Sequence, residues 1–97
     1  VTARHAGQGA SLPAITAGTW WTVESGGITV FRKAPDFPRT ILYPQAGLWA
    51  LLADPPCPMF RASRLMAVLM SVSLEQAEIE VGKTIQLWQD AGLLERA

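Results

Sequence analysis

The spacing of the hydrophobic residues changes once along the chain, at Pro44. Before Pro44, over residues 20–43, apolar and β-branched residues follow the period of two that is typical of strands. After it, hydrophobic residues recur every three or four positions, as they do on the buried face of a helix. The pattern predicts an α+β, winged-helix-like fold in which three N-terminal strands precede a three-helix bundle.

Residues 20–33 have the pattern of a β-hairpin, in which WWTV and ITVF are the strands and SGG is the turn. Alternation along the strands puts Trp21 and Val23 on one face. Ile28 and Val30 are their expected cross-strand partners. One of the two adjacent tryptophans therefore points into the core, and the other covers the outer face of the hairpin or meets a partner.

Residues 39–43, RTILY, are expected to form a third strand. They follow the segment APDFP, whose two prolines cannot donate a backbone hydrogen bond and so interrupt the ladder. Another proline follows them directly. We expect this short strand at an open edge of the sheet, where its unpaired backbone groups can accept a further strand.

Three helices are expected in the rest of the chain. The first begins at Pro44, since a proline needs no N–H partner in the first turn of a helix, and it ends in the segment ADPPCP. The second runs over about residues 60–70. The third, over residues 74–91, follows Ser73, which suits an N-cap, and stops at Gly92, a residue type typical of the position after a helix.

The chain of 97 residues is long enough for one compact domain and too short for two. Residues 1–18 are rich in Gly, Ala, Ser and Thr, and they are expected to form a mobile or loosely packed arm. The domain then comprises residues 19–97. Large hydrophobic residues of the strands and helices are expected in its core: Trp21, Val30, Leu48, Leu52, Leu65, Leu69, Val81, Ile85 and Trp88.

Composition and charge limit the classes of partner. Eight basic residues balance eight acidic ones, so the formal net charge is zero and no global field attracts phosphate backbones or anionic membranes. Charged residues make up only 16% of the chain and hydrophobic residues 49%, which favours apolar surface kept for a partner. No apolar run has the length of a membrane span, so no membrane contact is expected and cytosol is the expected compartment.

Candidate catalytic residues are few. His5 lies in the arm, far in sequence from any partner, and Cys57 lies among three prolines with no neighbouring group that would lower its thiol pKa. Glu75, Glu78 and Glu80 diverge in steps of about 100° on a helix, so they are expected to be solvated at its start. One Cys and one His do not make a zinc site. The sequence therefore predicts no enzyme, no cofactor and no metal.

The third helix disfavours binding to DNA. A helix that reads a DNA groove needs a basic surface towards the phosphates. Residues 74–91 contain four acidic residues but only Lys83 as a cation. We therefore expect no nucleic-acid partner.

The same helix carries apolar residues away from its expected core face, and these suggest a binding groove. Ile79 lies about 180° from the centre of that face, and Leu87 also lies well off it. An open strand beside such a helix forms a groove for an extended peptide, in which backbone bonds give affinity and side-chain pockets give selectivity. The residues expected to line this groove are Arg39, Thr40, Ile41 and Leu42 on the strand and Ile79, Lys83, Gln86 and Leu87 on the helix.

The runs ILYPQAGLWALL (41–52) and FRASRLMAVLMSVSLEQAEIEVGKTIQLWQDAGLLE (60–95) resemble the helical part of PqqD-like proteins, the peptide chaperones also called RiPP recognition elements. In that family a hairpin and a third strand lead into a helix that begins with proline, and the last helix ends in GLL, as at residues 92–94 here. The chain departs from the family at Tyr43, where an Asn is usual, and in the segment ADPPCP, which replaces a link containing Gly.

The resemblance implies a non-catalytic module that captures the leader region of a ribosomally made precursor peptide as a strand added to residues 39–43. It also implies that the module presents this peptide to a modifying enzyme, commonly a radical SAM protein. The alternative is a winged-helix assembly subunit that binds a protein partner, or a second copy of itself as a homodimer, through the same apolar surface. A DNA-binding regulator is the third interpretation.

Overall fold

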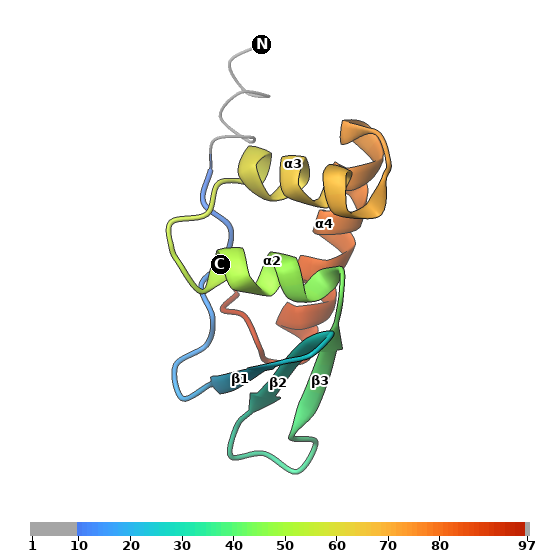
Figure 1. Ribbon diagram of the computed structural model, residues 1–97. Coiled ribbons are helices and arrows are strands. Elements are labelled where there is room, and N and C mark those ends of the chain that lie inside the picture. Colours follow the sequence, from blue (N-terminus) through green and yellow to red (C-terminus); the bar gives the residue numbers. More distant parts are fainter. Residues whose placement is uncertain (1–9, 97) are drawn as a thin grey trace.

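The computed structural model describes residues 10–96. Three strands are followed by three helices, which confirms the α+β order expected from the sequence (Figure 1). The strands form an antiparallel sheet in the order β1-β2-β3, and the helices cover one face of it. The elements are β1 Trp20–Glu24, β2 Gly27–Phe31, β3 Arg39–Leu42, α2 Gln45–Leu52, α3 Met59–Met70 and α4 Leu74–Asp90.

The hairpin has the register that alternation predicts. Trp21 pairs with Val30, and Val23 pairs with Ile28. Gly26 in the turn adopts a φ of +82°, a backbone conformation that favours glycine. Val23 is nevertheless 79% exposed, because it lies at the open tip of the hairpin.

Three tryptophans in edge-to-face contact connect the sheet with the helices. Trp49 of α2 is fully buried, and its ring centroid lies 5.6 Å from that of Trp21 and 5.4 Å from that of Trp88. Such aromatic pairs contribute about 0.5–1.5 kcal/mol each beyond the area they bury. Trp20 instead stacks on Phe31, its cross-strand partner, with centroids 5.9 Å apart. Of the two adjacent tryptophans, Trp21 is therefore the one that packs on the core.

Most of the expected core residues are buried: Val30, Leu48, Leu52, Val81, Ile85 and Trp88. Trp21 and Leu69 are half-buried and pack against this core, while Leu65 is half-buried at its border, beside Gly47 of α2. Further buried residues complete the core: Ala46, Ala62, Met66, Ala77, Leu93 and Leu94.

The ends of α4 follow the local signals in the sequence. The Ser73 hydroxyl caps the helix by accepting a hydrogen bond from the backbone N–H of Gln76 at 3.1 Å. At the other end Gly92 has a φ of +79°. The N–H of Leu93 then donates to the carbonyl of Trp88 at 2.8 Å, which closes a Schellman motif.

Part of the expected N-terminal arm is attached to the domain. The N–H of Leu12 donates to the carbonyl of Cys57 at 2.7 Å, and the N–H of Thr16 donates to the carbonyl of Leu93 at 3.0 Å. Residues 10–16 therefore run between the start of α3 and the C-terminal segment, and the expectation of a loose arm does not hold for them. Leu12 and Ile15 of this segment also pack against the core, so backbone hydrogen bonds and apolar packing together attach it.

Candidate peptide-binding site

The strand β3 lies at an edge of the sheet, as expected from its flanking prolines. One side of β3 pairs with β2, where Ile41 lies opposite Ile28 and Thr40 lies opposite Thr29. Within residues 10–96, no segment pairs with the other side. A further strand can therefore be added there without displacing one that is already bound.

Two residues of β3 direct their backbone groups away from the sheet. Directly after β3, the N–H of Tyr43 donates to the carbonyl of Gly26 at 3.1 Å, so the backbone of Tyr43 points towards the hairpin. The direction of the backbone N–H and C=O groups alternates from one residue to the next along an antiparallel strand, so those of Ile41 also point towards β2. Thr40 and Leu42 consequently point their N–H and C=O groups towards the free edge.

The side chains of β3 divide between the core and the surface. Ile41 is buried, while Leu42 is 65% exposed and Thr40 is exposed. Arg39 is also exposed, and its guanidinium lies 5.7 Å from the centroid of the Phe37 ring, a cation–π arrangement. Of the strand residues expected to line the groove, Ile41 therefore anchors the strand, and the other three can contact a ligand.

Three of the expected helix residues form a line along the exposed side of α4. Ile79, Lys83 and Leu87 are spaced four residues apart, which places them on successive turns. Ile79 is 54% and Leu87 is 65% exposed. The buried residues of the helix are Ala77, Val81, Ile85 and Trp88. The two apolar side chains are thus free of the core, with a cation between them.

Polar side chains beside this line are already paired along the helix. Gln86 donates to the Asp90 carboxylate at 3.0 Å, and so does Arg96, at 2.6 Å. The hydrogen bond from Arg96, followed by that from Gln86, lowers the pKa of Asp90 below its usual value. The Lys83 ammonium lies 3.8 Å from a carboxylate oxygen of Glu80 and is largely exposed, so this ion pair is weak. Lys83 can therefore turn to an acidic ligand, whereas Gln86 is engaged within α4.

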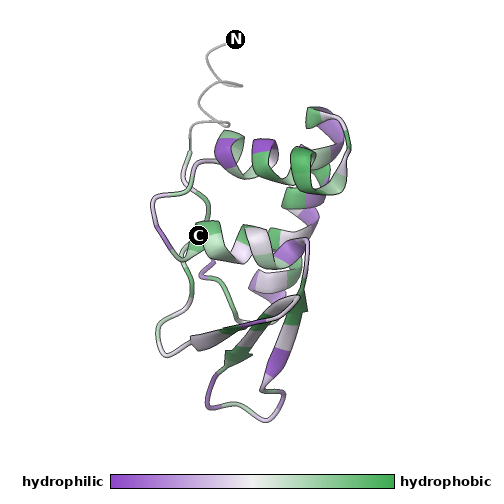
Figure 2. Ribbon diagram, viewed as in Figure 1, coloured by the Kyte–Doolittle hydropathy of each residue, from purple (hydrophilic) through white to green (hydrophobic). Residues whose placement is uncertain are grey.

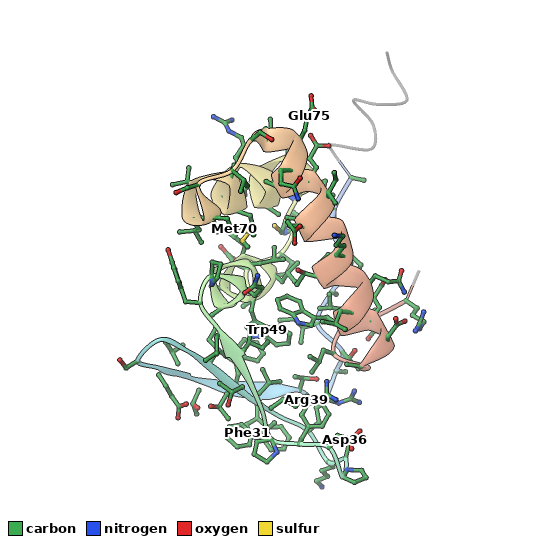
Figure 3. The ribbon with its side chains drawn as sticks, turned by 90° about the vertical axis from the view of Figure 1, so that its right-hand side faces the viewer. Phe31, Asp36, Arg39, Trp49, Met70 and Glu75 are labelled. Carbon is green, nitrogen blue, oxygen red and sulfur yellow. The ribbon has the colours of Figure 1, made fainter. Side chains whose placement is uncertain are left out.

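The strand and the helix lie on one side of the molecule without packing on each other. Figure 3 shows β3 and α4 running down the side that faces the viewer. β3 packs on β2 and α2, and α4 packs on α3. The backbones of β3 and α4 therefore run along the same side of the molecule, while Ile41, one of the expected residues, is buried in the core.

A hollow that the sequence did not reveal lies between the tip of the hairpin and α2, with a volume of about 330 Å³. We call it the tip hollow. Its lining residues are Val23, Glu24, Gly26, Gly27, Ile28, Tyr43, Ala46, Gly47 and Ala50. Glu24 is the one charged residue among them. Only a run of small residues in the first helix, AG at 46–47 and Ala50, hinted that the chain could leave space here.

The chemistry of the remaining candidates differs from that of an active site. Cys57 is buried, and this burial raises the pKa of its thiol, with Arg61 acting in the opposite direction. A protonated, buried thiol is a poor nucleophile. In the part of the chain that the structure describes, no three His, Cys, Asp or Glu residues group as metal ligands. His5 lies outside the described residues. No helix among residues 10–96 is long and apolar enough to cross a membrane.

Comparisons with known proteins provide no relative of this chain. No family model matches it, and no curated protein or solved structure matches it either. The resemblance to PqqD-like proteins therefore depends on the sequence runs quoted above, and it stays a prediction.

Proposed function

We propose that this chain is a non-catalytic module that captures an extended leader segment of a precursor peptide and presents it to a modifying enzyme. The observation that carries the proposal is the free edge of β3, where Thr40 and Leu42 point their backbone groups away from the sheet. A peptide that pairs with these groups becomes the next strand of the sheet. Binding of this kind requires an extended backbone and tolerates many side chains.

Backbone pairing alone is too weak for the proposed capture. Each hydrogen bond contributes about 0.5–1.5 kcal/mol net, so the four outward groups of Thr40 and Leu42 contribute roughly 2–6 kcal/mol. A micromolar dissociation constant requires about 8 kcal/mol. Side-chain contacts supply the rest, and the exposed apolar residues beside the edge, Leu42, Ile79 and Leu87, are the candidates.

Two cations near the edge can each pair with one acidic residue of a peptide. Arg39 lies on β3 itself, and Lys83 lies between the two exposed apolar residues of α4. Neither cation is held in a buried ion pair: Arg39 is exposed, and the contact of Lys83 with Glu80 is weak. Because α4 is otherwise acidic, a leader with single acidic residues among apolar ones fits this surface better than a leader that is acidic throughout.

A pair of variants at Thr40 tests the strand addition. Thr40→Pro removes the outward N–H, which no residue of the sheet uses, and a proline is tolerated at such a position of an edge strand. Thr40→Ala keeps the N–H and removes only the side chain. We expect Thr40→Pro to weaken binding about tenfold, since one bond of a cooperative ladder is lost, and Thr40→Ala to leave it nearly unchanged.

The measurement is an NMR titration of the labelled protein with a synthetic linear peptide in which single acidic residues stand among apolar ones. We expect shifts at Thr40 and Leu42 and along α4 at Ile79 and Leu87. Shifts confined to the outer face of the hairpin, around Trp20, would contradict the proposal. Equal binding by Thr40→Pro and Thr40→Ala would contradict strand addition. Binding only to a folded protein, and to no linear peptide, would favour the assembly-subunit alternative.

A further inference from the structure

The two faces of β3 carry different side chains. Ile41 is buried under the helices. Arg39 lies directly opposite Val30, which is fully buried, and residues opposite one another on neighbouring strands share a face, so Arg39 belongs to the helix-covered face as well. Thr40 and Leu42 alternate with these residues and therefore lie on the uncovered face. A strand added at the free edge continues both faces.

Along the helix-covered face, β3 begins with a cation and continues with an apolar residue. Figure 2 shows this change from hydrophilic to hydrophobic along the strand. Arg39 is exposed, and among residues 10–96 it forms no ion pair with a carboxylate. Its guanidinium lies 5.7 Å from the centroid of the Phe37 ring, and Phe37 packs against the core. The ring therefore holds the cation near the start of β3, where it can pair with a ligand.

The pairing rules of a sheet determine which ligand residues meet this face. Thr40 and Leu42 direct their backbone groups to the free edge, so a ligand strand exchanges hydrogen bonds with these two residues. The existing sheet is antiparallel, and antiparallel pairing is slightly more stable than parallel pairing. In an antiparallel ligand, the residue opposite Ile41 comes first and the residue opposite Arg39 follows two positions later. Both are non-hydrogen-bonded pairs, in which the side chains stand closer together.

We propose that the β3 edge selects an apolar residue that is followed, two positions later, by an acidic residue, and that Arg39 determines this specificity. The apolar side chain stands beside Ile41, on the side of the molecule along which α4 runs (Figure 3). The acidic side chain stands beside Arg39, where opposite charges on directly opposite residues attract. The reverse order places the acid beside Ile41. This inference rests on the proposed function and adds the order and spacing of the ligand residues to it.

Lys83 is the other cation on this side, and it separates the inference from a general attraction to acids. Its side chain is 70% exposed and belongs to α4 rather than to the sheet. An acid that pairs with Lys83 is not tied to the register of the ligand strand. A dependence on order and spacing is therefore a property of Arg39.

Two synthetic linear peptides of equal composition, both with blocked termini, test the order. One is Thr-Thr-Leu-Thr-Glu-Thr-Thr, and the other is its reverse, Thr-Thr-Glu-Thr-Leu-Thr-Thr. In NMR titrations of the labelled protein, we expect the first to bind at least about fivefold more tightly. Equal binding, or tighter binding of the reverse peptide, would overturn the inference and leave strand addition in place. Titrations without shifts at Thr40 and Leu42 would overturn the proposed function as well.

Charge reversal tests the role of Arg39. Arg39→Glu should bind the first peptide more weakly and should prefer its analogue with Lys in place of Glu by at least about fivefold, because opposite charges then face each other again. An analogue with Gln at this position should bind the wild type and the variant within about twofold, which a fold defect would not allow.

Arg64→Glu is the matched control, since it makes the same reversal at an exposed position of α3, at the opposite end of the molecule from the start of β3 (Figure 1). This variant should keep the preference of the wild type for the acidic peptide. A preference that survives Arg39→Glu, or that is lost in Lys83→Glu instead, would overturn the assignment of Arg39.

Discussion

The free edge of β3 and the tip hollow are neighbours in the chain, yet they offer a partner different chemistry. The edge presents backbone groups of Thr40 and Leu42, which any extended peptide can pair with. The tip hollow presents an apolar shape, which only particular side chains match. Tyr43 follows the first and lines the second. The comparison teaches that exposed hydrophobic residues on one small domain can serve two kinds of recognition, and that different substitutions should disturb each.

The two surfaces share a support, because α2 lines the tip hollow and also packs on β3. The predictions below begin with the residue that supports both surfaces and end with a residue that concerns only one.

The largest effect is expected at Trp49, because both surfaces depend on α2 and Trp49 fixes that helix on the core. Its ring is fully buried between Trp21 and Trp88. Trp49→Ala should lower the free energy of unfolding by about 3–5 kcal/mol, as measured by denaturant titration, and should weaken peptide binding as well.

Trp49→Phe is the control for this variant. It keeps an aromatic ring, and it removes the indole Nε1–H, which has no hydrogen-bond partner in the described part of the structure. Its loss of stability should be well below that of Trp49→Ala. A loss below about 1 kcal/mol for Trp49→Ala would show that the tryptophan cluster does not hold α2 in place.

The next effect separates the two surfaces. Ala50 lines the tip hollow and is exposed. Ala50→Trp fills the hollow and leaves the β3 edge unchanged. Peptide binding, followed by NMR titration, should therefore stay within about twofold of the wild type. Ala34→Trp, a matched change at an exposed loop position, should also leave peptide binding unchanged. Loss of peptide binding in Ala50→Trp would show that the two surfaces are one.

A smaller effect is expected where α3 ends, because its end differs from that of α4. α4 ends at Gly92, with a φ of +79°, whereas α3 ends at Ser71, whose φ of +56° is costly for any residue with a Cβ. Ser71→Gly relieves about 1–2 kcal/mol of backbone strain in the folded chain. It also makes the unfolded chain more flexible, which lowers the stability of the fold by about 0.4–1 kcal/mol. The variant should therefore be more stable by roughly 0.5–1 kcal/mol in denaturant titration. A destabilised variant would show that the Ser71 side chain has a role of its own.

The sequence predicts more of the fold than of the candidate site, for a physical reason. Strand and helix periods, the N-cap Ser73 and the stop at Gly92 are local signals, and the structure follows them. The attachment of residues 10–16 depends on backbone hydrogen bonds to distant segments and on two large apolar side chains, Leu12 and Ile15, and neither leaves a period in the sequence.

The same limit applies to the candidate site. Exposure of Ile79 and Leu87 could be derived from the helical period, because an angle on one helix is a local property. The tip hollow could not be derived, since it exists only where the hairpin meets the small residues of α2. The core role of Ile41 depends on which side of β3 the helices cover, and that is also a matter of tertiary packing.

The smallest effect concerns Asp90, at the C-terminal end of the α4 surface. The hydrogen bond from Arg96, with that from Gln86, lowers the pKa of this carboxyl in the folded chain. A lowered folded pKa contributes stability that is present above the unfolded value of about 3.9 and is lost as the pH falls through the folded pKa. Asp90→Asn removes this contribution. The free energy of unfolding of this variant, from denaturant titration, should therefore depend less on pH than that of the wild type between about pH 4 and the folded pKa.

Because Asp90 is fully exposed, solvent screening keeps this difference small. Protonation of Asp90 also weakens its hold on Gln86, which could then turn to a peptide. NMR as the pH falls through the folded pKa of Asp90 should therefore show a change at the side-chain amide of Gln86 in the wild type that is absent in Asp90→Asn. A change of equal size in both proteins would show that Asp90 does not restrain Gln86.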